Sequence, residues 1–267
     1  MSAPQAVAQI PAIDSLAAPA GWRTIDFISD LHLAEDTPRG FEAWARYLRG
    51  TSADAVFMLG DWLELWVGDD ARDGEFEQRC IALLTEVSSR RALAFMAGNR
   101  DFLIGDEMLQ ACRMRRLHDP TVLEAFGQRY LLTHGDALCL SDTDYQRFRA
   151  QVRSEAFIAQ FLARPLAERR VIARGVRDGS EQRKATEARG VWADVDIPEA
   201  LRWLAAADAP VMIHGHTHRP ASQTIGPGIV RHVLSDWDLD TASTLRADVL
   251  RLTAEGVHRL SPEQAAA

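Results

Sequence analysis

The most informative part of this 267-residue chain is VMIHGHTHRP, residues 211–220. The apolar run Val211–Ile213 suits a short buried strand. Three histidines then follow at alternate positions, His214, His216 and His218. Three alternating histidines are costly in a core and unusual in a turn, whereas imidazoles two residues apart can reach neighbouring metal ions from one face. The stretch therefore predicts a strand that ends at a metal site.

Four earlier parts of the chain repeat this arrangement of an apolar run followed by polar side chains. The runs are Thr24–Ser29, Ala55–Leu59, Ala92–Ala97 and Arg129–Thr133, and the polar groups after them are Asp30 with His32, Gly60 with Asp61, Gly98 with Asn99, and His134. Each group alone also fits an ordinary strand-end turn. Carboxylate, amide and imidazole groups from successive strand ends can, however, converge on two metal ions that activate water to attack a phosphate ester.

Several details of these groups carry their own expectations. Asp30 and His32 leave the same face if the strand stays extended. Arg100 can clamp phosphate oxygens with its planar fork, and Asp101 can orient the group by bonding to Arg100 or to the backbone. Asp69 and Asp70 follow Gly68 and are interpreted as solvated turn formers.

The remaining pattern indicates an α/β core with a helical insertion. Phe41, Trp44, Ala45 and Leu48 form a helical stripe between the first two strands, and the early order is strand, helix, strand, helix, strand. Tyr145 to about Arg189 reads as several helices, with Pro165 opening one of them. Asp196 and Glu199 indicate a capping box at the helix that returns the chain to its sheet.

These patterns predict how the chain is divided. Ile229–Leu234 and Leu245–Leu252 are expected to add strands, and the tail after Ser261 is expected to be disordered. We expect a disordered extension over 1–21, a core over 22–144 and 195–258, and a helical cap over 145–194.

Composition and charge narrow the class of protein. Apolar residues make up 47% and charged residues 25%, which is ordinary for a soluble globular protein. Cys80, Cys112 and Cys139 lack zinc or redox spacing and indicate a reducing compartment. The first 21 residues fit neither a signal peptide nor a membrane anchor.

One basic segment stands out in a chain whose net charge is −8. Residues 147–189 contain eleven basic and five acidic residues. Such a segment is most often a solvated helical face, and the alternative is contact with an anionic substrate or lipid surface. It lacks the interleaved aromatic residues of a nucleic-acid platform, so we expect no nucleic-acid partner.

The order of motifs resembles the calcineurin-like metallophosphoesterase family over about residues 24–236. Within it, the chain is most similar to the branch of UDP-2,3-diacylglucosamine hydrolases of lipid A biosynthesis. Four stretches carry that similarity: GDWLELWVGDD (60–70), GNRDFL (98–103), HGDALCLSDTDYQRFR (134–149) and HGHTHRP (214–220).

The resemblance implies a fold, cofactors and a location. The fold is a four-layered αββα sandwich with a helical cap insertion, and the cofactors are two Mn²⁺ ions per chain. The protein would act as a monomer in the cytoplasm, at the periphery of the bacterial inner membrane.

The resemblance also implies roles for individual residues. Asp30, His32 and His218 would hold one metal, Asn99, His134 and His216 the other, and Asp61 would bridge them, while His214 would not be a ligand. The substrate-binding positions would be Asn99, Arg100, Asp142, Tyr145, Ser180, Lys184 and His216, and the catalytic set would be Asp61, Asn99, Arg100 and His216. The family's basic residue after the Ser180 position falls on Glu187 here, and Lys184 is the nearest lysine.

The expected reaction is hydrolysis of the pyrophosphate bond of UDP-2,3-diacylglucosamine, which gives UMP and 2,3-diacylglucosamine 1-phosphate (lipid X). Within enzymes, the alternative is a phosphodiesterase or nucleotide pyrophosphatase that acts on a soluble substrate, and the arginine-rich apolar insertion argues against it. From another class, a metal-free binding scaffold would have no reason to retain every ligand in order.

Overall fold

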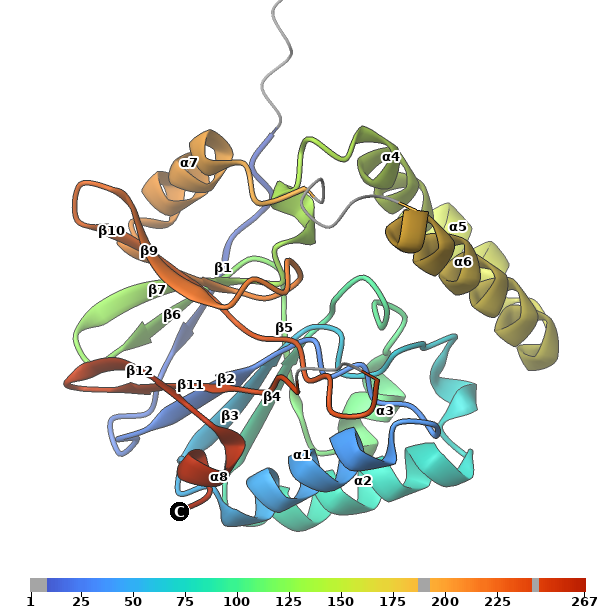
Figure 1. Cartoon of the computed structure of the whole chain (residues 1–267), viewed down its shortest axis with the longest axis horizontal. Coiled ribbons are helices and arrows are strands. Elements are labelled where there is room, and N and C mark those ends of the chain that lie inside the picture. Colours follow the sequence, from blue (N-terminus) through green and yellow to red (C-terminus); the bar gives the residue numbers. More distant parts are fainter. Residues whose placement is uncertain (1–8, 187–192, 242–244) are drawn as a thin grey trace, which may run out of the picture.

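Two six-stranded sheets pack face to face at the centre of the computed structural model, which describes residues 9–186, 193–241 and 245–267, without the side chains of residues 178–186 (Figure 1). The first sheet has, in spatial order, β12 (Gly256–Leu260), β11 (Val249–Thr253), β2 (Ile25–Ile28), β3 (Ala55–Leu59), β4 (Ala92–Met96) and β5 (Arg115–Leu117). The second has β1 (Asp14–Ala17), β6 (Thr121–Ala125), β7 (Gln128–Thr133), β8 (Val211–His214), β10 (Ile229–Val233) and β9 (Ala221–Gly226).

The strands that were expected to end in polar side chains lie in the middle of these sheets. β2, β3 and β4 are neighbours and parallel, and so are β7 and β8. Because parallel strands point the same way, their carboxyl ends come together at one edge. The expected strands over 229–234 and 245–252 are present as β10 and β11.

Helices cover both outer faces of the paired sheets. On the first sheet lie α1 (Pro38–Gly50), α2 (Glu75–Ser88), the short α3 (Asp106–Ala111) and α8 (Pro262–Ala265), and on the second lies α7 (Ile197–Ala207) (Figure 1). Short 3₁₀ turns occupy Asp69–Ala71 and Asp136–Leu138.

The side chains of a single strand point alternately to the two faces of its sheet, and this shows how the layers are built. In β3, Val56 and Met58 pack in the cluster under α1 and α2, whereas Phe57 and Leu59 pack between the sheets. A third cluster fills the space between the second sheet and α7, around Trp203 and Leu204. Three apolar layers separate four structural layers, so the expected αββα sandwich is confirmed.

Three helices lie beside the sandwich, between the 3₁₀ turn at Asp136–Leu138 and α7 in the chain (Figure 1). They are α4 (Thr143–Val152), α5 (Glu155–Leu162) and α6 (Leu166–Thr186). Pro165 immediately precedes α6, in keeping with its expected place at a helix start. We refer to α4–α6 as the cap helices.

The helix start at Asp196 is confirmed, but the capping box is wrong. The Asp196 side chain accepts from the Glu199 N–H at 2.9 Å, as an N-cap should. The reciprocal bond is not made, because the Asp196 N–H donates to the carbonyl of Leu138 at 2.8 Å. The Glu199 carboxylate instead accepts from Trp203 and Arg202.

Both chain ends differ from the expectation of disorder. Asp14–Ala17 form β1, which pairs parallel to β6, although only Leu16 of that strand is buried. A single buried side chain gives no alternating pattern, so the strand could not be read from the sequence. At the other end, Ser261 and Gln264 form a capping box that starts α8, and Ala265 is fully buried. Residues 1–8 of the expected extension lie outside the described part of the chain.

Replacing Leu16 with alanine is expected to lower the free energy of unfolding by about 2 kcal/mol, because Leu16 is 7% exposed and packs between the sheets. Urea unfolding measures this loss. Ser15→Ala, at an exposed position of the same strand, serves as control and should change stability by less than about 0.5 kcal/mol. Equal stability of both variants would mean that β1 does not bind the sheet in solution.

Candidate metal centre

Seven polar side chains meet where the carboxyl ends of both sets of parallel strands converge. They follow β2, β3 and β4 of the first sheet and β7 and β8 of the second: Asp30, His32, Asp61, Asn99, His134, His216 and His218. Backbone bonds tie the loops together, since the Asp30 N–H donates to Gly60 and the Gly215 N–H donates to His134, each at 3.0 Å.

Five of these seven residues have a left-handed backbone. The φ angles are +52° at Asp30, +48° at His32, +53° at Asp61, +65° at His216 and +52° at His218. The expectation that Asp30 and His32 project from an extended strand is therefore wrong, because β2 ends at Ile28 and both residues lie in the loop that follows it. Each such backbone costs on the order of 1 kcal/mol and persists only where surrounding bonds hold it.

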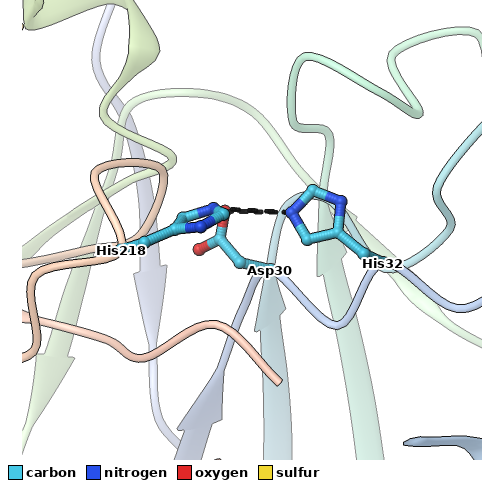
Figure 2. A group of neighbouring side chains, drawn as sticks. All are labelled: Asp30, His32 and His218. Carbon is cyan, nitrogen blue, oxygen red and sulfur yellow. Dashed lines mark hydrogen bonds and ion pairs between the residues drawn. The ribbon is translucent and has the colours of Figure 1, made fainter. Parts of the chain in front are cut away.

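The first half of the centre joins Asp30, His32 and His218 (Figure 2). The Nε2 atoms of the two histidines are 3.4 Å apart, and the Nε2 of His218 is 3.2 Å from Asp30 Oδ1. On its far side, His32 places Nδ1 2.6 Å from Glu64 Oε2, and His218 places Nδ1 3.5 Å from Asp236 Oδ2.

This arrangement fits a cation. A carboxylate at each Nδ1 favours the tautomer that carries its proton there, which turns both Nε2 lone pairs toward each other and toward Asp30. Two lone pairs and a carboxylate within 4.8 Å of one another repel unless positive charge lies between them. Histidines backed by carboxylates are the usual outer arrangement of protein metal sites.

The second half of the centre joins Asn99, His134 and His216. Asn99 Oδ1 is 3.1 Å from His134 Nε2 and 2.9 Å from His216 Nδ1. The Nδ1 of His134 is 2.9 Å from the carbonyl of Leu59, so it donates there and leaves Nε2 facing the centre. Asp61 lies between the halves, with Oδ2 3.8 Å from His32 Nε2 and Oδ1 3.7 Å from His134 Nε2.

Two glycines let these loops approach each other. A Cβ at Gly60, where φ is +93°, would overlap the ring of His134, and a Cβ at Gly98 would overlap Asp61. The glycines of the motifs therefore make room for the ligands of neighbouring loops.

The electrostatics of the centre demand positive charge. Burial favours the neutral form of His134 and His218, yet the surrounding carboxylates outweigh it and raise the pKa of each to about 9. Burial likewise disfavours the charged form of Asp30, but His218 and the other histidines hold its pKa well below the usual range. His216 is different, because burial and the nearby His134 lower its pKa to about 3.

His214, the first histidine of the triplet, is placed differently from the other two. Its Nδ1 donates to the carbonyl of Gly215 at 2.8 Å, and burial together with Arg231 lowers its pKa to about 4. It is a neutral, fully buried side chain.

Carboxylates behind the expected ligands accept hydrogen bonds from them and from their loops, and the sequence indicated only some of these carboxylates. Asp101 accepts backbone N–H bonds from Gly98 (2.8 Å) and Trp62 (2.7 Å), which confirms its expected orienting role. Burial and the nearby Asp61 raise its pKa to about 7. Glu64 and Asp236 were missed, because nothing in the sequence signals which distant carboxylate backs a histidine.

Arg100 and Tyr145 also lie at the centre. The Arg100 N–H donates to Asp61 at 2.8 Å, and its guanidinium is 3.6 Å from Glu64. Tyr145 stacks on His216 with ring centroids 5.9 Å apart and donates to Asp136 at 2.7 Å. Asp142 caps α4 by accepting from the Tyr145 N–H. Ser180 and Lys184 have side chains outside the described part of the chain.

Several arginines of the basic segment face the core, which corrects the interpretation of the segment as a solvated face. Arg149 and Arg153 donate to buried Asp136 at 2.8 and 3.1 Å. Arg169, only 3% exposed, bonds Asp70 and the carbonyl of Val67. Asp70, which is 56% exposed and belongs to the 3₁₀ turn at Asp69–Ala71, is thus also a docking residue for α6.

Asp69 lies in the same 3₁₀ turn and is half-buried, and its side chain does more than form the turn. Its carboxylate accepts from the backbone N–H of Gly105 at 2.8 Å and of Met108 at 3.0 Å, at the start of α3. It also accepts from the indole of Trp66 at 3.2 Å.

Comparison with known proteins shows a single family. Residues 23–220 match the family model described as calcineurin-like phosphoesterase. A protein of Xanthomonas axonopodis pv. citri (strain 306) called UDP-2,3-diacylglucosamine hydrolase is 42% identical over 233 residues, which cover 83% of this chain and 94% of that protein. A protein of Chromobacterium violaceum with the same name is 44% identical over 216 residues, covering 80% and 90%.

Among solved structures, the E. coli phosphoesterase Yfce has a TM-score of 0.44 and 14% identity, covering 90% of this chain and 94% of that one. None of the helices in the described residues combines the length and apolar character needed to cross a membrane.

Divalent cation binding is expected to release protons, because His134 and His218, with pKa values near 9, are protonated at neutral pH without metal. Release should be about two protons at pH 7 and about one at pH 9, and affinity should rise with pH over this range. Calorimetry in buffers of different ionisation enthalpy measures the number. His258→Gln, which removes an exposed histidine, is the control. Binding of Mn²⁺ without proton release at pH 7 contradicts the expectation.

Proposed function

Because this chain belongs to the calcineurin-like phosphoesterase family, we propose that it hydrolyses UDP-2,3-diacylglucosamine to UMP and 2,3-diacylglucosamine 1-phosphate in lipid A biosynthesis. The observation that carries the proposal is the pair of ligand groups that share Asp30, one with His32 and His218 and one with Asp61 and His134. The name of the two relatives supplies the substrate.

We propose that the centre holds two Mn²⁺ ions. Asp30, His32 and His218 would hold one, Asn99, His134 and His216 would hold the other, and Asp61 would serve both. Oxygen and imidazole ligands without thiolate suit manganese, and Cys80, Cys112 and Cys139 are buried away from this set. A pair of such cations supplies Lewis acidity and lowers the pKa of water at the reacting phosphorus.

The chain's own residues position the diphosphate. Asp61 sets the spacing between the two halves, because each of its oxygens faces a different one. Arg100 stabilises phosphoryl charge from the rim, where its side chain is 13% exposed. Burial keeps the His216 ring neutral, and Tyr145 stacks on it and fixes its orientation. The ring can therefore accept a hydrogen bond or bind a metal ion without first losing a proton.

The cap helices complete the substrate site in this proposal. Asn99, Arg100, Tyr145 and His216 contact the phosphates and the sugar from the centre. Asp142, Ser180 and Lys184 extend the contacts along the cap. The stack of Tyr145 on His216 supports this, because it places α4 directly over one half of the centre.

Purified protein given Mn²⁺ and UDP-2,3-diacylglucosamine is expected to release UMP and 2,3-diacylglucosamine 1-phosphate, detected by mass spectrometry. Asp61→Asn keeps the side-chain shape and tolerates the left-handed backbone, yet removes the charge, and should lower kcat about a thousandfold. Asp144→Asn, at an exposed carboxylate on α4, should leave the rate unchanged.

Turnover of bis-p-nitrophenyl phosphate without any UMP from the lipid nucleotide would favour the alternative of a phosphodiesterase for soluble substrates. Inertness toward both substrates, with less than one equivalent of metal bound, would favour the binding scaffold.

We also propose that the protein acts as a monomer at the cytoplasmic face of the inner membrane, with the cap helices against the lipid. Each of these helices exposes a large apolar side chain: Phe148 on α4, Leu162 on α5 and Val171, 70% exposed, on α6. Arg147 directly precedes Phe148 and Arg164 lies two residues after Leu162, and both arginines are exposed. Apolar side chains with flanking cations suit a surface of anionic lipid.

Val171→Glu is expected to reduce binding to phosphatidylglycerol-containing vesicles about fivefold, since it puts a charge in the apolar interface. Co-sedimentation measures the bound fraction. Leu245→Glu, at a 50% exposed leucine outside the cap helices, is the matched control and should bind like the parent protein. Equal loss in both variants would show that the cap is not the docking surface.

A further inference from the structure

A pocket of about 640 Å³ lies between α6 and the loops that follow β2 and β3. Its walls are residues 33–36, residues 63–67, residues 74–77 at the start of α2, and the α6 arginines Arg170, Arg174 and Arg177. We call it the α6 pocket. None of its residues belongs to the proposed ligand set or to the substrate positions expected from the family.

The α6 pocket opens beside the metal centre. Glu64 belongs to its wall and lies 2.6 Å from the ring of His32, and Leu33, the residue after that histidine, is also part of the wall. A diphosphate at the centre carries a lipid-bearing sugar on one side and a nucleoside on the other. The pocket is therefore within reach of one of these two groups.

The chemistry of the walls distinguishes the two groups. Four carboxylates, Glu35, Asp36, Glu75 and Glu77, line the pocket together with the arginines. An acyl chain would separate these charges from water and give them no partner, which is costly. Uridine instead offers donors to carboxylates from its ribose hydroxyls and uracil N–H, and acceptors to arginines from its uracil oxygens and phosphate.

The apolar part of the walls has room for a ring. Leu65, Val67 and Phe76 contribute apolar surface between the charged groups. A flat pyrimidine ring can cover such a surface, whereas a fatty acyl chain needs a longer apolar groove.

Arg174 is the arginine best placed to bind a ligand. Arg177 bonds Glu64 at 3.0 Å, and the charge of Arg170 acts on Asp70. Within the part of the chain whose side chains are described, Arg174 makes no hydrogen bond or ion pair. Its guanidinium is exposed and lines the pocket.

We propose that the α6 pocket binds the uridine monophosphate half of the substrate, with Arg174 as a contact to its anionic or carbonyl oxygens. This inference rests on the proposed function and adds a nucleotide subsite to it. It places the nucleotide and the lipid on different sides of the centre, so the two products leave by separate paths.

The test uses the full-length protein loaded with Mn²⁺ and measures UMP binding by calorimetry, with inorganic phosphate as reference. The affinity for phosphate measures binding at the metal centre alone. The additional affinity for UMP measures the contribution of the pocket. Arg174→Gln is expected to weaken UMP binding about tenfold and to raise KM for UDP-2,3-diacylglucosamine by a similar factor, with kcat and phosphate binding unchanged. Arg90→Gln, at an exposed arginine after α2 that is paired with Glu86, is the matched control.

A second variant tests whether the loss of UMP binding comes only from removing the positive charge of Arg174. Phe76→Ala should also weaken UMP more than phosphate, and circular dichroism establishes that both variants are folded. Unchanged UMP affinity in both variants overturns the proposal. Weaker binding of 2,3-diacylglucosamine 1-phosphate with UMP unaffected also overturns it and makes the pocket an acyl site.

Failure of the proposed function would look different from failure of the pocket. In that case the parent protein forms no UMP from the lipid nucleotide. The titrations with UMP and phosphate still report whether the pocket recognises a nucleotide.

Discussion

The buried carboxylate of Asp30 is the interaction on which the rest of this structure depends. It follows β2 of the first sheet. It accepts from the backbone N–H of His216 at 2.9 Å and lies 3.2 Å from Nε2 of His218, and both histidines belong to the loop after β8 of the second sheet. Ser29 donates to the same group at 2.5 Å. A fully buried charge must be neutralised, and here the partners that neutralise it come from the opposite layer of the sandwich.

This constraint explains why two separate sheets share one centre. The carboxyl ends of β2, β3 and β4 bring oxygen ligands and one histidine, and those of β7 and β8 bring the remaining histidines. Neither sheet alone contains a complete set. The centre therefore requires that the two sheets be packed together, which the apolar layer around Phe57 achieves.

Much of this could be predicted from the sequence, because apolar runs and the polar residues after them are local signals. The strands before Asp30, Asp61, Asn99, His134 and His214 are all present. What could not be predicted depends on contacts between distant residues. Glu64 behind His32 and Asp236 behind His218 are examples, and so is β1, whose place at the sheet edge follows from pairing with β6.

The basic segment shows the same limit of local patterns. Its charge alone could not reveal which arginines point inward. Arg149 and Arg153 converge on Asp136, two residues after His134, and Arg177 reaches Glu64. The cap helices are thus fastened to residues that adjoin the ligands, and their position is linked to the shape of the centre.

The left-handed backbone at five of the centre's residues restricts the residue types that evolution can place there. Aspartate, asparagine and histidine adopt that backbone far more readily than β-branched residues, which find it a true outlier. Substitutions at Asp30 or His218 are thus confined to a few residue types, whichever ion the protein carries. A descendant that lost its catalytic role would keep these side-chain types longer than chemistry alone requires, so their retention by itself is weak evidence of activity.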